Sequence, residues 1–93
     1  LVAAKHGSRE ALSIGAGAGH LTAIKAYAKM LLMLFRAEVL SQKQIKRLML
    51  SSGRLDNASL AVQDAYKSAL RKLRDNAALT TDQYGDILDR VFG

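Results

Sequence analysis

Apolar residues recur at helical spacing in this chain and are densest between residues 20 and 36. One apolar stripe there is widened by neighbouring apolar residues until only Lys25, Lys29 and Arg36 clearly lie outside it. A helix that is apolar on almost every side has to be covered on most of its surface. The pattern therefore predicts a central helix over residues 20–36, with the run from Met30 to Phe35 in the core.

Two capping signals predict where further helices begin. Ser41 with Gln44, and Thr80 with Gln83, have the spacing of a capping box, in which two side chains satisfy backbone N–H groups of the first helical turn. Apolar residues at helical spacing follow each signal. We therefore expect one helix to start after Ser41 and the last helix of the chain to start after Thr80.

Two other segments complete the predicted set of helices. One runs to about Arg74 with Asp56 or Asn57 as its N-terminal cap, and a short one over residues 8–16 is weakened by glycines. The expected inward positions of the longer segment are Leu60, Val62, Tyr66, Ala69, Leu70 and Leu73. Proline is absent, and Ala, Leu, Lys and Arg, which favour helices, are abundant. We therefore predict an all-α fold of about five short helices.

The chain is partly similar to itself at an offset of 39 residues. Six of 24 aligned positions are identical, pairing Ala26 with Ala65, Tyr27 with Tyr66, Leu31 with Leu70, Leu34 with Leu73, Leu40 with Leu79 and Gln44 with Gln83. The same offset puts the two capping boxes in register. We interpret residues 1–93 as one helical domain, with a first repeat-like unit at 1–50 and a degenerate second unit or cap at 51–93. Because the chain begins with Leu1, we expect it to be a C-terminal fragment of a longer protein.

One stretch carries a family resemblance. Residues 19–27, Gly-His-Leu-Thr-Ala-Ile-Lys-Ala-Tyr, preceded by Ala11-Leu12 and by residues 1–5, resemble the ankyrin-like repeats of bacterial type III secreted effectors, the Shigella enterotoxin-2-like group among them. The similarity covers about residues 1–34. It implies an ankyrin-like helical repeat or capping bundle that docks a host or bacterial protein, with any catalytic domain elsewhere in the chain. It also implies secretion into a host cell, and without it we expect a cytoplasmic location.

The same stretch departs from the family pattern at several positions. Gly15 and Gly17 replace better helix formers, and Ala58-Ser59 stands where the second unit would have Gly-His. The regularity of the predicted stack is weakened at both places.

No residue pattern indicates an enzyme, a metal site or a cofactor site. Cysteine is absent, and the two histidines, His6 and His20, are far apart in the sequence. Residues 14–21 imitate the start of a dinucleotide-binding fingerprint, but His20 stands where its third glycine is required and the preceding residues make a poor strand. His20 also has no candidate nucleophile beside it, so we interpret it as a turn or capping residue. If the whole protein is an enzyme, we expect its active site upstream of this chain.

Charge supplies the candidate contact residues. The formal net charge is +6, and residues 1–74 hold thirteen Lys and Arg against four acidic residues, while residues 75–93 hold one against four. The candidate partner-binding residues are the cations Lys43, Lys46, Arg47, Arg54, Lys67, Arg71 and Arg74. We interpret them as contacts for a protein partner, and the alternative is a basic helical nucleic-acid-binding domain. The longest apolar run is far shorter than the ~20 residues of a transmembrane helix, so no membrane span is expected.

Overall fold

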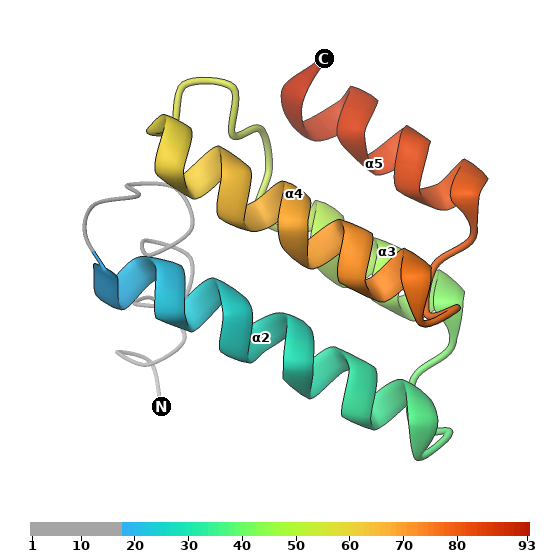
Figure 1. Ribbon diagram of the computed structural model, residues 1–93. Coiled ribbons are helices and arrows are strands. Elements are labelled where there is room, and N and C mark those ends of the chain that lie inside the picture. Colours follow the sequence, from blue (N-terminus) through green and yellow to red (C-terminus); the bar gives the residue numbers. More distant parts are fainter. Residues whose placement is uncertain (1–17) are drawn as a thin grey trace.

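The computed structural model describes residues 18–93, with side chains described from Leu21 onward, and this part of the chain holds four helices and no strands (Figure 1). The helices are α2 (Ala18–Arg36), α3 (Gln42–Leu50), α4 (Leu60–Asp75) and α5 (Thr81–Phe92). The all-α prediction is confirmed for these residues. Their helix count is four instead of about five, and the helix expected over residues 8–16 lies outside the described residues.

Both predicted capping boxes form. The hydroxyl of Ser41 accepts a hydrogen bond from the Gln44 N–H group at 3.2 Å, and the Gln44 side chain accepts one from the Ser41 N–H group at 2.8 Å. The equivalent distances for Thr80 and Gln83 are 3.0 and 2.9 Å. Helices α3 and α5 therefore begin where the local sequence directs them to begin.

The start of α4 differs from the prediction, because its N-cap is Ser59 and not Asp56 or Asn57. The buried Leu55 donates its N–H group to the Val91 carbonyl at 2.9 Å and accepts a hydrogen bond from the Ala58 N–H group at 3.1 Å. These bonds hold the segment before Ser59 in a turn, so the helix starts later than expected.

Leu60 was expected to face inward, and this expectation is wrong, because its side chain is 76% exposed. Leu60 is the first residue of α4 and lies nine positions before the buried Ala69. At about 100° per residue, nine positions place it on the opposite side of the helix.

The helices form two pairs, each made of a longer helix, a turn and a shorter helix. We call α2 with α3 the first pair and α4 with α5 the second pair. In Figure 1, α2 and α4 lie side by side and run in the same direction, whereas α5 runs back along α4. Helix α3 returns behind α4 in this view and packs against α5. Like elements of the two pairs are therefore neighbours.

The core lies among all four helices and the loop before α4. Its main cluster consists of Leu31, Leu32, Ile45, Met49, Leu55, Tyr66, Leu70, Leu73, Ala78, Leu79, Ile87 and Val91. A smaller cluster joins α2 to α4 through Ile24, Ala28, Val62 and Ala69. None of the described helices combines the length and the apolar character that crossing a bilayer demands.

The prediction that the whole run from Met30 to Phe35 is core is only partly correct. Leu31 and Leu32 are buried, but Met30 and Met33 are 45% and 62% exposed. Among the described residues, neighbouring helices cover one side of α2 and leave the side with these two methionines open.

Candidate functional site

The turn after α2, residues 37–40, is the first of two surfaces that stand out, and we call it the first turn. Val39 donates its N–H group to the Leu34 carbonyl at 2.9 Å, and Glu38 donates to the Phe35 carbonyl at 3.0 Å. This pair of hydrogen bonds is the Schellman motif that ends many helices. Glu38 takes the left-handed conformation that the motif requires, with φ of 62°.

The turn after α4, residues 76–79, repeats this geometry 39 positions later, and we call it the second turn. Ala78 donates to the Leu73 carbonyl at 2.8 Å, and Ala77 donates to the Arg74 carbonyl at 3.0 Å. Ala77 also has φ of 62°. Helix end, left-handed residue and capping box therefore recur at the offset of the sequence repeat.

The two turns differ in what covers them. Val39 is 61% exposed, whereas Ala78, its equivalent, is 0% exposed. Leu40 is half-buried, and its equivalent Leu79 is fully buried in the main core cluster. The backbone is the same in both places, so the difference comes from the neighbouring helices.

The first pair covers the second turn through two side chains. Gln42 donates its side-chain amide to the Ala77 carbonyl at 2.7 Å, and Arg36 donates to the Asn76 side chain at 2.8 Å. At the first turn the equivalent acceptor is the carbonyl of Glu38, to which no described residue donates a hydrogen bond. The first turn thus keeps an apolar surface and an acceptor that the second turn uses for packing.

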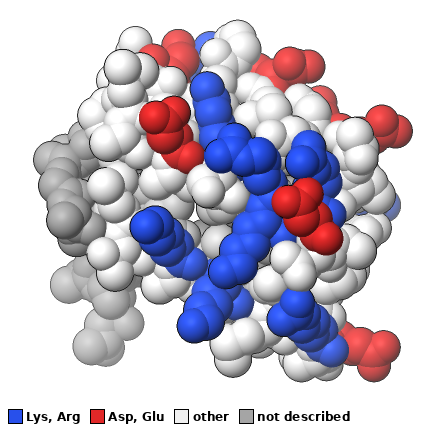
Figure 2. All heavy atoms as spheres, in the orientation of Figure 1, with Lys and Arg blue, Asp and Glu red and all other residues white. Residues whose placement is uncertain are grey.

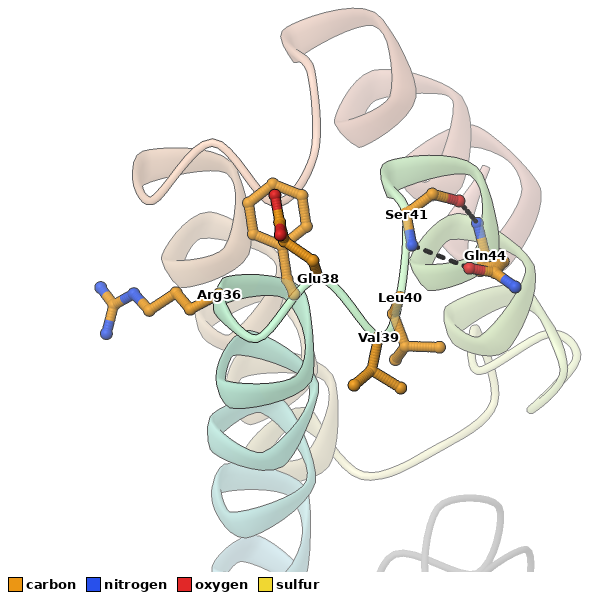
Figure 3. A pocket seen from close by; sticks show the side chains of 7 residues that line it. Arg36, Glu38, Val39, Leu40, Ser41 and Gln44 are labelled. Atoms are coloured by element: carbon orange, nitrogen blue, oxygen red, sulfur yellow. Dashed lines mark hydrogen bonds between the residues drawn. The ribbon is translucent and has the colours of Figure 1, made fainter.

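A hollow of about 550 Å³ opens at the first turn, lined by Phe35, Arg36, Glu38, Val39, Leu40, Ser41 and Gln44. In Figure 3 the side chains of Val39 and Leu40 point into the space between the ends of α2 and α3, and Arg36 points away from it. The reciprocal hydrogen bonds of Ser41 and Gln44 hold the α3 side of this hollow in place. The lining can make apolar contacts and accept hydrogen bonds.

The second surface is a basic face over α2 and α4. These two helices hold seven Lys and Arg against two Asp, a balance of +5, and α2 holds no acidic residue. Figure 2, drawn in the orientation of Figure 1, shows Lys and Arg side chains as a nearly continuous band across this face. Helices α3 and α5 hold four Lys and Arg against three Asp. The positive charge is therefore concentrated on one layer of the fold.

Four of the seven candidate partner-binding residues make contacts within the chain. Lys46 pairs with Asp86 at 2.6 Å, and Arg54 pairs with Asp56 at 3.3 Å and also donates to the Gly93 carbonyl. The ammonium group of Lys67 lies 4.8 Å from the ring centroid of Phe92, and the guanidinium group of Arg74 lies 4.4 Å from that of Tyr84. These contacts attach α5 and the chain end to the other elements.

Two of these cations shift the pKa of their acidic partners. Hydrogen bonds from Lys46 and then from Arg90 lower the pKa of the Asp86 carboxyl group, because they stabilise its charged form. A hydrogen bond from Arg54 lowers the pKa of Asp56 in the same way.

The other three candidates, Lys43, Arg47 and Arg71, form no hydrogen bond or ion pair with described residues. Lys43 and Arg47 lie one helical turn apart on the side of α3 opposite the buried Ile45. The core therefore separates them from Arg71 on the basic face, and the seven cations do not form one site.

Several residues of these surfaces were not candidates from the sequence. They are Val39 and Leu40 at the first turn and Lys25, Lys29 and Lys72 on the basic face. The offset of 39 pairs Val39 with Ala78 and could have flagged that position, but it does not tell which of the two is covered. The described residues contain no group of three or more His, Cys, Asp or Glu that could hold a metal ion.

Comparison with models of protein families, with curated proteins and with solved structures gives no match for this chain.

Proposed function

We propose that this chain is a docking module that binds a protein partner at the first turn. The observation that carries the proposal is the contrast between exposed Val39 and fully buried Ala78 in turns of the same geometry. The second turn is stable under a cover of helical residues, so the same backbone at the first turn is suited to receive a similar cover. Burying the exposed apolar area there would favour binding by about 25 cal/mol per Å².

The cover of the second turn indicates what the partner presents. It would place an apolar side chain over Val39 and Leu40 and direct a hydrogen-bond donor at the Glu38 carbonyl, as Gln42 does at the Ala77 carbonyl. A side-chain amide or guanidinium group at the start or end of a helix has this chemistry. The partner segment is therefore helical in this proposal.

The biological setting is part of the proposal and rests on the sequence resemblance alone. In that setting the chain docks a host or bacterial protein as part of a bacterial secreted effector inside a host cell. Any catalytic domain of the protein would lie outside this chain.

A charge placed at the first turn tests the docking site. Val39→Glu puts a carboxylate in the hollow, and Leu60→Glu makes a similar change at another exposed apolar residue. We expect proteins captured from nuclease-treated eukaryotic lysate by the unaltered chain and by Leu60→Glu to be lost from Val39→Glu. Quantitative mass spectrometry measures this, with circular dichroism to verify that all three proteins are folded. Equal capture by both variants would contradict the proposed site.

Nucleic-acid binding is the second candidate, and the concentration of cations on the basic face favours it. Under this alternative, unrelated duplexes bind with an affinity that falls steeply between about 50 and 200 mM salt. Charge reversal at Lys67 and Arg71 should then abolish binding, which fluorescence anisotropy with a labelled duplex measures.

A further inference from the structure

We propose that the groove between α2 and α4 binds an acidic amphipathic helix of a partner protein. This is a second contact surface, on a different face from the hollow at the first turn, and it rests on the proposed docking function for the class of its partner. Six residues line the groove, whose volume is about 220 Å³: Lys25, Ala28, Ala65, Ser68, Ala69 and Lys72.

The floor of the groove is apolar and made of small side chains. Ala28 and Ala69 belong to the cluster that joins α2 to α4, and Ala65 packs against it. Because packed helices lie 8–10 Å apart according to the size of the side chains between them, alanines allow a third helix to approach closely. The groove follows two helices that run side by side in the same direction, so a helix can lie along it (Figure 1).

The rims of the groove are cationic on both sides. Lys25 of α2 and Lys72 of α4 line it from opposite sides, Lys29 is one turn beyond Lys25, and Arg71 adjoins Lys72. These four side chains form no ion pair with the acidic groups of the described residues. An anionic partner would neutralise like charges that otherwise repel each other across the groove. The complementary ligand has Asp or Glu on both sides of a narrow strip of small apolar residues.

The floor favours a helix over a nucleic acid. A phosphate backbone can pair with the lysines but gains nothing from an alanine floor. None of the six lining residues is aromatic, so the groove offers no platform for stacking bases. An amphipathic helix uses both features, since its apolar strip packs on the alanines while its carboxylates meet the rims.

A designed peptide tests the proposal. The probe is a labelled helix of about 16 residues, matching a groove of about 24 Å along α4, with an alanine strip flanked by glutamates. We expect it to bind the unaltered protein more tightly than a scrambled peptide of the same composition or a duplex DNA of equal charge. The double variant Lys25→Glu with Lys72→Glu should weaken peptide binding about tenfold or more.

Two further variants separate a groove from a general charge effect. Lys43→Glu with Arg47→Glu makes the same change in net charge on the far side of α3 and should leave the peptide affinity within about threefold. Ser68→Trp fills the groove at an exposed position without changing charge and should weaken binding about tenfold. Equal losses in both double variants, unchanged binding by Ser68→Trp, or tighter binding of the duplex than of the peptide would each overturn the inference.

Val39→Glu distinguishes this inference from the proposed function. We expect it to remove partner capture from lysate while leaving peptide binding unchanged, because Val39 is not part of the groove. If peptide binding fails and capture still depends on Val39, the groove proposal alone is wrong. If capture does not depend on Val39 while the peptide binds as expected, the first-turn site alone is wrong.

Discussion

The two helix pairs share a backbone pattern and differ in burial. Each has a Schellman turn with a left-handed residue and then a capping box, and these features recur 39 residues apart. The second turn is packed beneath the first pair, whereas the first turn has no equivalent cover among the described residues. Local interactions therefore set the shape of each pair, and the position of a pair in the stack sets which of its residues become core.

The largest expected difference between the pairs concerns two equivalent leucines. Leu73 is fully buried and Leu34 is half-buried. We expect Leu73→Ala to lower the free energy of unfolding by about 2–5 kcal/mol, because it leaves a cavity in the core. Leu34→Ala should lower it by about 1 kcal/mol, because less apolar surface is lost there. Urea denaturation measures both values, and equal losses would show that the two pairs are equally packed.

Exchanging the residues that differ at the turns tests the same contrast. Ala78→Val adds two methyl groups where there is no exposed surface, and we expect it to cost about 1–3 kcal/mol through overpacking. Val39→Ala removes two methyl groups from an exposed position and should change stability by less than about 0.5 kcal/mol. Thermal unfolding monitored by circular dichroism compares the two. A large loss for Val39→Ala would mean that the first turn is already covered.

The two equivalent tyrosines make a third comparison. Tyr66 is buried and donates its hydroxyl group to the Met49 carbonyl at the end of α3, whereas Tyr27 is half-buried. Tyr66→Phe leaves that buried carbonyl without its donor, so we expect a loss of about 1–3 kcal/mol. Tyr27→Phe serves as the matched control and should change the stability by less than about 0.5 kcal/mol.

The pKa values of these tyrosines give the comparison a pH dependence. Burial raises the pKa of Tyr66 strongly and also raises that of Tyr27. A raised pKa favours the protonated folded form, so this contribution to stability is present below about pH 10 and is lost as pH rises further. Alkaline unfolding should therefore begin at a lower pH in the unaltered protein than in Tyr66→Phe relative to its own stability at neutral pH.

The smallest expected effect concerns charge and occurs at low pH. Asp86 binds Lys46 at 2.6 Å and Arg90 at 3.0 Å, and its equivalent in the first pair is Arg47. Because its pKa is lowered in the folded state, its contribution is present at neutral pH and is lost as pH falls below about 4 through the folded-state value. We expect the melting temperature of Asp86→Asn to fall less between neutral pH and pH about 3 than that of the unaltered protein. An identical fall in both would show that this ion pair does not contribute.

The sequence indicated the helices better than it indicated the site. The capping boxes at Ser41 and Thr80 are correct because hydrogen bonds within four residues define them. The prediction for Leu60 fails because it depends on where α4 starts, and a hydrogen bond from Leu55 to the distant Val91 influences that start. The candidate cations were chosen for charge, and their partners, such as Phe92 for Lys67, come from another helix.

The sequence alone determined the all-α class of the described part, the start of α3 and of α5, and the repeat that relates the two pairs. These properties depend on residues close together in the chain, where propensity and capping act. Only the tertiary structure decided that Ala78 is buried while Val39 is exposed, and that Lys25 and Lys72 line one groove. Both outcomes depend on how α2 and α4 pack, which brings together residues about 40 positions apart and is not encoded by either segment alone.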